Sequence, residues 1–252
     1  MSDPFAARRA RFRDLHRDGC FVLPNPWDAG SAQRLAALGF KALASSSSAA
    51  ALSLGTTDYR ITLDQCLAHL EMLCAATDLP MNADFENAFA HDPDEVATNV
   101  TRAIATGIAG LSIEDQHDGQ LYPFELAVAR IEAARAAIDA SGADVILVAR
   151  TERRLWDIST PDEARARLVA FAEAGADCLY APGPTKADEI AAIVAAVAPK
   201  PVDVLLMNAE MRVADLAKFG VRRVSTGGAL ANAAWRGFDE AAAALAADAG
   251  LA

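Results

Sequence analysis

The stretch that decides the fold is GLSIEDQHDGQLYPFELAVARIEAARAAIDASGADVILVAR, which spans residues 110–150. It opens with a short apolar run, Gly110–Glu114, and closes with a second one, Val145–Arg150. Between the two runs, apolar residues recur at the spacing of one helix face: Phe124, Val128, Ile131, Ala134 and Ile138. Strand, helix and strand in this order are typical of the βα units that build parallel α/β folds.

The same alternation runs along the whole chain. Eight strands are predicted, at Cys20–Leu23, Ala42–Ser45, Pro80–Asp84, Gly110–Glu114, Val145–Arg150, Cys178–Ala181, Val202–Leu206 and Arg223–Ser225. They begin about 29 residues apart on average, which is the repeat of a βα unit. A doubly wound sheet is the rival fold, but no G-x-G-x-x-G follows the first strand. We therefore predict one α/β domain over residues 1–252, a (β/α)8 TIM barrel with a short N-terminal helix and a last helix from about Ala229 to Ala249.

Composition limits the functions that this chain can have. Hydrophobic residues make up 53% of the 252 residues and charged ones 23%, so a large core can form. The net charge of −11, with 23 Lys and Arg against 34 Asp and Glu, argues against a nucleic-acid partner. Neither a signal-peptide pattern nor an apolar run of membrane-spanning length is found, and the four cysteines lack C-x-x-C spacing. We expect a soluble, cytoplasmic protein with reduced thiols.

Polar residues gather where the predicted strands end, which is the face that carries the chemistry in α/β barrels. Four consecutive strands run into such segments: Ser45–Ser48, Asn82–Asn87, Glu114–His117 and Arg150–Glu152. This clustering of hydroxyls, carboxylates and a guanidinium at one rim favours an enzyme.

Two carboxylates in these segments suggest a metal site. Asp84 and Glu114 end neighbouring strands, and like charges held close together either raise a pKa or share a cation. Oxygen ligands without a Cys/His set favour Mg2+ or Mn2+. Alternatively, each carboxylate caps the following helix or pairs with Arg150. Glycosidase chemistry is a lesser option because the chain has few aromatic residues to line a sugar site.

Three further features are candidates for binding and proton transfer. The serine run can hold an anion with its amides and hydroxyls, or it is a polar turn. Arg150 either grips a substrate carboxylate or forms a salt bridge to Glu114. His117 is the histidine placed for acid–base work, in a segment, Gln116–Pro123, that we expect to be a mobile lid or else a fixed connection.

Five segments together resemble the isocitrate lyase/phosphoenolpyruvate mutase superfamily. They are Asn25-Pro26-Trp27-Asp28, Gly39-Phe40-Lys41, Ala83-Asp84, Ile113-Glu114-Asp115 and Ala149-Arg150-Thr151-Glu152. The resemblance runs from about Phe21 to Trp235, and its landmarks keep their order and rough spacing.

The resemblance implies an α/β barrel that uses Mg2+ on α-keto or 2-hydroxy acids through an enolate-like intermediate. It also implies a homotetramer, or at least a dimer, in which subunits exchange the last helix. The matched metal-site acids are Asp58, Asp84 and Glu114. The matched substrate contacts are Ser46, Ser47 and Arg150, and we add Trp27, Ser45 and Asp84 from the same strand-end segments.

The chain also departs from the family pattern. Asn82 stands where the family usually has the first acid of Asp-x-Asp, which should weaken or reshape the metal site, although Glu86 could compensate. The Lys-Lys-Cys-Gly-His loop of the lyases is absent, and the histidine that several members carry after strand six is replaced by Tyr180-Ala181-Pro182. A plain isocitrate or methylisocitrate lyase is therefore not expected.

The leading hypothesis is a Mg2+-dependent lyase that cleaves a C–C bond in a small, anionic α-keto or 2-hydroxy carboxylic acid. Arg150 would orient a carboxylate, and His117 or water would move the proton. One alternative is C–P chemistry on phosphonopyruvate or phosphoenolpyruvate, as a hydrolase or mutase. The other is a carboxylate-binding barrel without catalysis.

Overall fold

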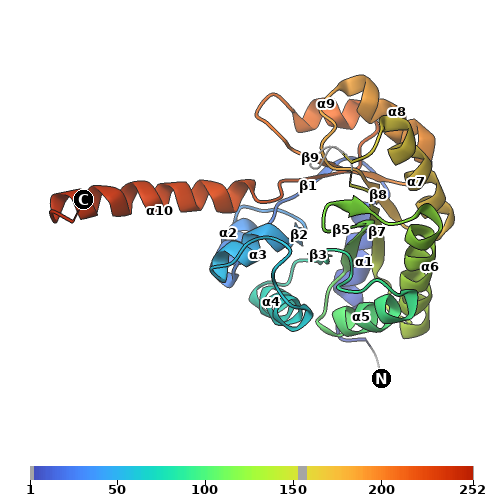
Figure 1. Cartoon of the computed structure of the whole chain (residues 1–252), viewed down its shortest axis with the longest axis horizontal. Coiled ribbons are helices and arrows are strands. Elements are labelled where there is room, and N and C mark those ends of the chain that lie inside the picture. The colour runs from blue at the N-terminus through green and yellow to red at the C-terminus, as the bar shows by residue number, and fades with distance from the viewer. Residues whose placement is uncertain (1–2, 153–157, 252) are drawn as a thin grey trace.

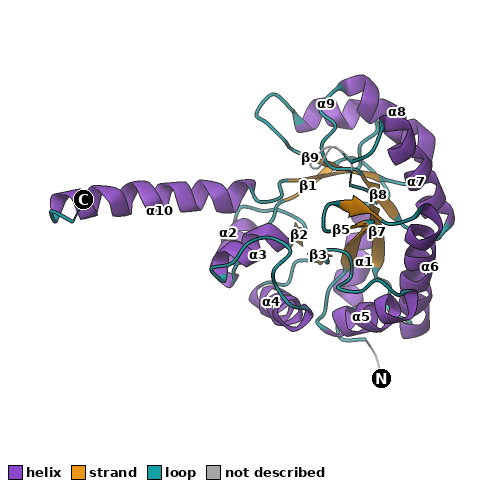
Figure 2. Cartoon of the chain, viewed as in Figure 1, coloured by secondary structure: helices purple, strands orange, loops and turns teal. Residues whose placement is uncertain are grey.

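A nearly closed barrel of eight parallel strands with helices between them forms the body of the molecule (Figures 1 and 2). The structure is a computed structural model that describes residues 3–152 and 158–251. The barrel strands are β1 (Phe21–Leu23), β2 (Leu43–Ala44), β3 (Met81–Asp84), β4 (Gly110–Glu114), β7 (Ile146–Arg150), β8 (Cys178–Tyr180), β9 (Val202–Leu205) and β10 (Arg223–Ser225). Each of the eight predicted strands is confirmed, with ends that differ by at most one residue.

The strands follow one another around the ring in the order β1-β10-β9-β8-β7-β4-β3-β2. Between β2 and β1, the Ala44 amide donates to the Pro24 carbonyl over 3.1 Å. Because all strands of the ring run in the same direction, their carboxyl ends meet at one rim. The predicted TIM barrel is therefore confirmed, and the polar strand-end segments share one face.

The helices surround the strands in the order that the sequence patterns predict. Their bounds are α1 (Ala6–Leu15), α2 (Ala29–Ala37), α3 (Ser47–Ser53), α4 (Leu63–Ala76), α5 (Pro93–Ala105), α6 (Phe124–Ser141), α7 (Pro161–Glu173), α8 (Ala187–Val197), α9 (Val213–Lys218) and α10 (Ala229–Asp248). The side chains of Thr62, Asp92 and Thr160 each accept a hydrogen bond from the first turn of the helix that follows. These caps satisfy amides that would otherwise lack an acceptor.

Alternate residues of the strands pack in two different places, as the pleat requires. Leu111, Ile113 and Leu147 point outward into the large core beneath the helices. Ile146 and Val148 point inward, into a smaller cluster that fills the barrel. Phe12 of α1 is fully buried in this inner cluster, so α1 closes the end of the barrel at which the strands begin.

His16, just after α1, lies half-buried beside this closed end. Its Nδ1 lies 2.8 Å from the Phe12 carbonyl, and its Nε2 has no hydrogen-bond partner among the described residues. Burial lowers the pKa of His16 to about 3, and the Arg223 guanidinium adds to this shift. The folded protein therefore holds this imidazole neutral.

We expect stability to fall as the pH falls because of His16. Below the ordinary histidine pKa of 6.5, the unfolded chain binds a proton that the folded chain excludes. Between about pH 6.5 and pH 4.5 this difference should remove about 2 kcal/mol of stability. Urea unfolding of His16→Gln across this range should show a correspondingly flatter pH dependence. If stability depends on pH as steeply in His16→Gln as in the wild-type protein, His16 is not the group responsible.

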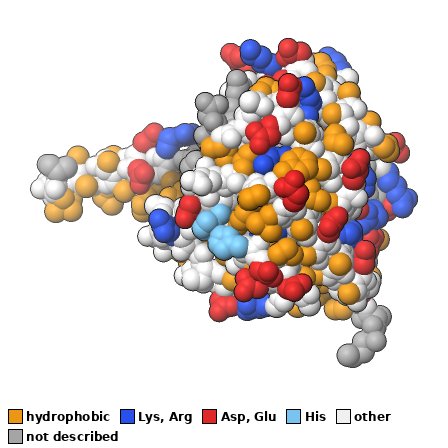
Figure 3. All heavy atoms as spheres, turned by 45° about the vertical axis from the view of Figure 1, so that its right-hand side comes forward, with side chains coloured by type: hydrophobic (Ala, Val, Ile, Leu, Met, Phe, Trp, Pro, Cys, Tyr) orange, Lys and Arg blue, Asp and Glu red, His pale blue; other side chains and the backbone are white. Residues whose placement is uncertain are grey.

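The last helix, α10, projects away from the barrel (Figure 1). Ala231 is its one buried residue, and hydrophobic side chains follow one edge of the projecting part (Figure 3). Phe238 is 62% exposed and Leu245 69%. The helix begins at Ala229 as predicted. Among the described residues, none of the helices combines the length and the hydropathy that a membrane span requires.

Candidate active site

A cavity of about 400 Å³ opens at the carboxyl ends of the strands. Its charged and amide-bearing lining residues are Asn25, Asp58, Asn82, Asp84, Arg150, Asp203, Arg223 and Asn232, and its hydroxyl-bearing ones are Ser45–Ser48, Ser112, Tyr180, Ser225 and Thr226. Of the predicted site residues, the structure therefore brings together the serine run, Asp58, Asp84 and Arg150. It does not bring Trp27, Glu114 or His117 to this lining.

Arg150, the last residue of β7, is surrounded by carboxylates. Its Nη1 lies 3.0 Å from Glu114 Oε1 and 3.4 Å from Asp84 Oδ1, and its Nε donates to Glu152. The guanidinium lies over the Tyr180 ring, with Arg150 Cζ 5.3 Å from the centre of the ring. The salt bridge to Glu114 is present, and Arg150 also lines the cavity, where a substrate carboxylate can reach it.

Glu114, at the end of β4, is held by protein groups behind the cavity wall. Its Oε2 accepts hydrogen bonds from the Tyr59 hydroxyl (2.8 Å) and the Gln116 side-chain amide (2.9 Å). Burial raises the pKa of Glu114, and the Arg150 guanidinium opposes this shift. Glu114 therefore anchors Arg150 and the segment that carries Tyr59.

The serine run is tied to Asp84, which ends the neighbouring strand. The Ser47 amide donates to Asp84 Oδ2 over 2.9 Å, and the Asp84 amide donates to Ser45 Oγ over 2.8 Å. Ser46 caps α3 by accepting a hydrogen bond from the Ala49 amide. These bonds hold the hydroxyls of the run along one wall of the cavity.

Asp58 and Asp84 are the carboxylates on the cavity wall that could hold a cation. Burial raises the pKa of Asp58, the negative charge of Asp84 raises it further, and the Ser47 hydroxyl opposes the shift. A cation placed between two such carboxylates would relieve their repulsion. Among the described residues, no group of three or more His, Cys, Asp or Glu side chains is arranged to hold a metal. Mg2+ often uses only one or two carboxylates and keeps several waters.

Asn82 lies on the inward face of β3, where it lines the cavity and joins side chains of other strands. Its Nδ2 donates to Ser112 Oγ over 3.0 Å, and its Oδ1 accepts from Arg223 Nη1 over 3.3 Å. Gly110 makes room for it, because a Cβ there would lie 2.7 Å from Asn82 Oδ1. The departure at this position thus belongs to a polar layer within the barrel.

His117 lies on a second cavity of about 380 Å³ beside the first. It belongs to a small hairpin of β5 (Gln116–His117) and β6 (Gln120–Leu121), whose turn places Asp118 and Gly119 at positive φ. Two residues at positive φ match the twist of a tight hairpin. The segment Gln116–Pro123, a mobile lid or a fixed connection by its sequence, thus begins with a hairpin. Its motion and the role of His117 in proton transfer stay predictions.

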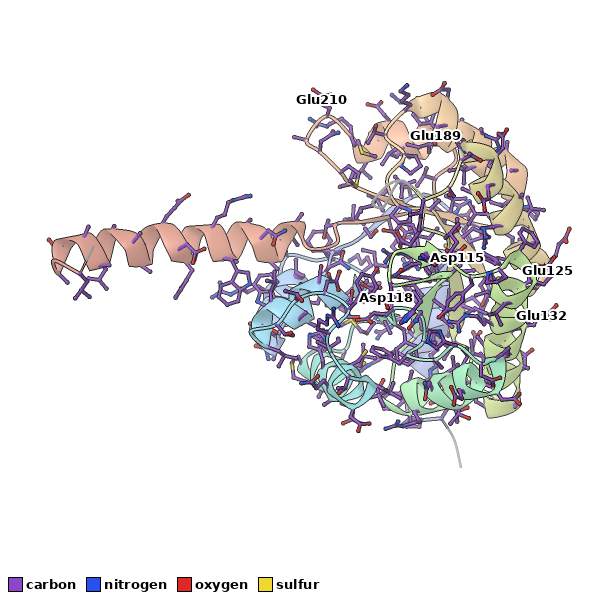
Figure 4. The ribbon with its side chains drawn as sticks, viewed as in Figure 1. Asp115, Asp118, Glu125, Glu132, Glu189 and Glu210 are labelled. Atoms are coloured by element: carbon purple, nitrogen blue, oxygen red, sulfur yellow. The ribbon has the colours of Figure 1, made fainter. Side chains whose placement is uncertain are left out.

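Asp115, a motif residue to which the sequence assigned no role, holds the segment after β7 in place. Its carboxylate accepts from Thr151 Oγ1 (2.7 Å) and the Glu152 amide (3.0 Å), and it pairs with Arg167. Figure 4 shows Asp115 and Asp118 near the middle of the molecule, whereas Glu125 and Glu132 lie on the outer side of α6. Asp115 thereby fixes the backbone that follows Arg150.

The sequence reasoning placed Trp27 in the site and missed Asn25. The Trp27 amide donates to Ser31 Oγ and its carbonyl lies 2.9 Å from His69 Nε2, so its backbone holds a turn. Asn25 lines the cavity and joins β1 to the segment after β10, since its Oδ1 accepts from the Thr226 and Gly227 amides.

Asp203 and Arg223 were also missed as site residues. They pair inside the barrel at 3.1 Å, with side chains 1% and 2% exposed. One pattern in the sequence could have identified them. Each is a charged residue in a short strand, at a position whose side chain points into the barrel.

The fold and this cavity define an α/β-barrel protein with its polar site at the strand ends. The family model described as phosphoenolpyruvate phosphomutase matches residues 12–246. The chain is 30% identical over 236 residues to an oxaloacetate decarboxylase of Paraburkholderia xenovorans (strain LB400), which covers 88% of this chain and 75% of that protein. It is 33% identical over 220 residues to an uncharacterised Mycobacterium tuberculosis protein (strain ATCC 25618 / H37Rv), covering 86% of this chain and 81% of that protein.

Among solved structures, that of 2,3-dimethylmalate lyase superposes with a TM-score of 0.87 at 26% identity, over 99% of this chain and 89% of that one. The chain therefore belongs to the phosphoenolpyruvate phosphomutase family, within the isocitrate lyase/phosphoenolpyruvate mutase superfamily of lyases and mutases. The resemblance stated from the sequence is confirmed.

Proposed function

We propose that the protein is a Mg2+-dependent lyase that cleaves a C–C bond in a small α-keto or 2-hydroxy carboxylic acid. The observation that carries this proposal is the shared cavity of Arg150, the serine run, Asp58 and Asp84. The names of the relatives oxaloacetate decarboxylase and 2,3-dimethylmalate lyase support small carboxylic acids as the class of substrate.

In this proposal the cavity residues bind the substrate carboxylate, stabilise the keto oxygen and transfer a proton. Arg150 orients a substrate carboxylate with the planar donor pattern that suits it. Ser46 and Ser47 lie on the same cavity, and the Ser46 hydroxyl donates toward the keto oxygen, where negative charge grows as the C–C bond breaks. Proton transfer to the enolate-like fragment falls to His117, if the hairpin brings it to the cavity, or to water.

Mg2+ or Mn2+ would be held by Asp58 and Asp84, with Glu114 behind them. A divalent ion, when bound, supplies charge that stabilises the negative oxygen of the enolate. The donor set fits such an ion because two carboxylates and a serine hydroxyl face one cavity and the pKa of Asp58 is raised by burial and by Asp84. Asn82 brings no charge, so modest affinity is expected.

The decisive variant is Asp84→Ala. We expect calorimetric titration to show loss of Mg2+ binding, because one of two facing carboxylates is removed. Turnover of 2-oxo and 2-hydroxy dicarboxylic acids, followed by NMR, should disappear as well. Glu132→Ala, on the outer side of α6, is the matched control and should keep both (Figure 4). Unchanged Mg2+ affinity in Asp84→Ala would refute the metal assignment.

The same NMR measurement separates the alternatives. The name of the matching family model, phosphoenolpyruvate phosphomutase, supports testing phosphonopyruvate and phosphoenolpyruvate beside the carboxylic acids. Turnover of the phosphonates alone would replace C–C cleavage by C–P chemistry. Binding of a keto acid without any turnover would indicate a carboxylate-binding barrel.

We further propose that a second copy of the chain covers α10, as the resemblance implies. Exposed Phe238 and Leu245 form an apolar edge that water would otherwise contact. Sedimentation of the full chain should show a dimer or tetramer, and Phe238→Glu should shift it toward the monomer. Glu240→Gln, on the same helix, is the control. A wild-type monomer at micromolar concentration would contradict the exchange.

A further inference from the structure

The second cavity, of about 380 Å³, has a lining that the proposed reaction leaves largely unused. Its acidic lining residues are Glu86, Glu95 and Asp118, and its buried or half-buried apolar ones are Ile61, Leu63 and Phe89. Within the described part of the chain, no Lys or Arg lines it. We call it the acidic cavity.

Glu86 is the buried carboxyl group of the acidic cavity. It is 5% exposed, whereas Glu95 and Asp118 are exposed at the surface. Glu86 Oε1 makes no hydrogen bond to the described residues. Buried polar atoms are almost always paired, because leaving one unpaired is unfavourable. Since Glu86 lines the cavity, a hydrogen-bond donor in the cavity can complete it.

The segment that carries Glu86 is held firmly in an uncommon conformation. The φ angles of Glu86, Ala88 and Phe89 are 46°, 59° and 54°, a region that residues with a Cβ seldom adopt. Arg130, which is 1% exposed, donates to three backbone carbonyls between residues 87 and 91. Such strain persists only where the surrounding structure enforces it. The position of Glu86 is therefore fixed by the fold.

The charges around Glu86 define which donor fits. The carboxylates of Asp84, Glu114 and Asp58 act on it electrostatically, against the one guanidinium of Arg150. Arg150 is itself paired with two of these carboxylates. An anion would be repelled here, whereas a primary ammonium group brings three donors and a positive charge. The apolar wall favours an organic cation over a metal ion, because only the organic cation has a carbon chain to place there.

We propose that the acidic cavity binds a small organic amine, with its primary ammonium group at Glu86 and its carbon chain against Ile61, Leu63 and Phe89. This site is separate from the cavity of Arg150 and the serine run, since the two cavities have no described lining residue in common. It therefore does not depend on the proposed reaction.

The test compares the binding of butan-1-amine and butan-1-ol by calorimetry, with EDTA and at constant ionic strength. The wild-type protein should bind the amine about ten- to hundredfold more tightly, because only the ammonium group forms a charge-assisted hydrogen bond with Glu86. Glu86→Gln should remove most of this preference. The variant should fold, because the amide has nearly the shape of the carboxyl group and replaces an atom without a partner.

Glu132→Gln, on the outer side of α6, is the matched control and should keep the preference (Figure 4). It separates a specific site from general attraction of amines to a chain with a net charge of −11. Equal affinity of the wild-type protein for the amine and the alcohol would overturn the proposal, as would an unchanged preference in Glu86→Gln. One-for-one displacement of the amine by Mg2+ would assign Glu86 to the metal and overturn the amine site.

Discussion

Replacing Arg150 with methionine is expected to lower the free energy of unfolding by about 3–5 kcal/mol, the usual loss when one partner of a buried ion pair is removed. The side chains of Glu114 and Glu152 are 1% and 0% exposed, so their charges would be left in the interior without a cation. Asp84 would lose the same partner. Urea unfolding monitored by circular dichroism measures the loss.

Two further variants test the reason for this loss. Glu152→Gln in the Arg150→Met background should recover part of the stability, because a neutral amide needs no cation. Arg150→Lys keeps the charge but loses the planar geometry. If the guanidinium binds the substrate carboxylate, this variant should lose about 2–4 kcal/mol of transition-state binding, measured as a lower kcat/KM. Near-normal kcat/KM in Arg150→Lys would make Arg150 purely structural.

The Asp203–Arg223 pair gives the second large effect. Asp203→Ala should destabilise the fold by about 3–5 kcal/mol, because it leaves the Arg223 guanidinium buried without its partner. The double variant Asp203→Leu/Arg223→Met should recover most of this loss, since apolar side chains can fill a barrel interior as well as a buried ion pair does.

The double variant also tests why the pair is there. It should be about as stable as the wild-type protein if the ion pair does no more than fill the interior. Stability equal to that of the wild-type protein would show that the fold does not require the ion pair. If the double variant remains as unstable as Asp203→Ala, the pair is instead a requirement of the fold.

Local patterns in the sequence were sufficient to predict the barrel. Strands such as Gly110–Glu114 and helices capped by Thr62 or Asp92 depend on neighbours in the chain, so spacing and capping residues reveal them. The rim position of Arg150 and Asp84 followed as well, because the carboxyl ends of parallel strands share one face.

The partners of these side chains were decided by the tertiary structure. The sequence left Glu114 either at a metal or in a salt bridge with Arg150, and closure of the barrel brings Arg150, Tyr59 and Gln116 to its carboxylate. Asn82 could be identified as a departure from the family pattern, while its contact with Arg223 joins residues 141 positions apart. The sequence by itself determined the elements and the face on which the polar residues lie. The tertiary structure determined which charges meet, because burial and ion pairing depend on residues that only the closed ring of strands brings together.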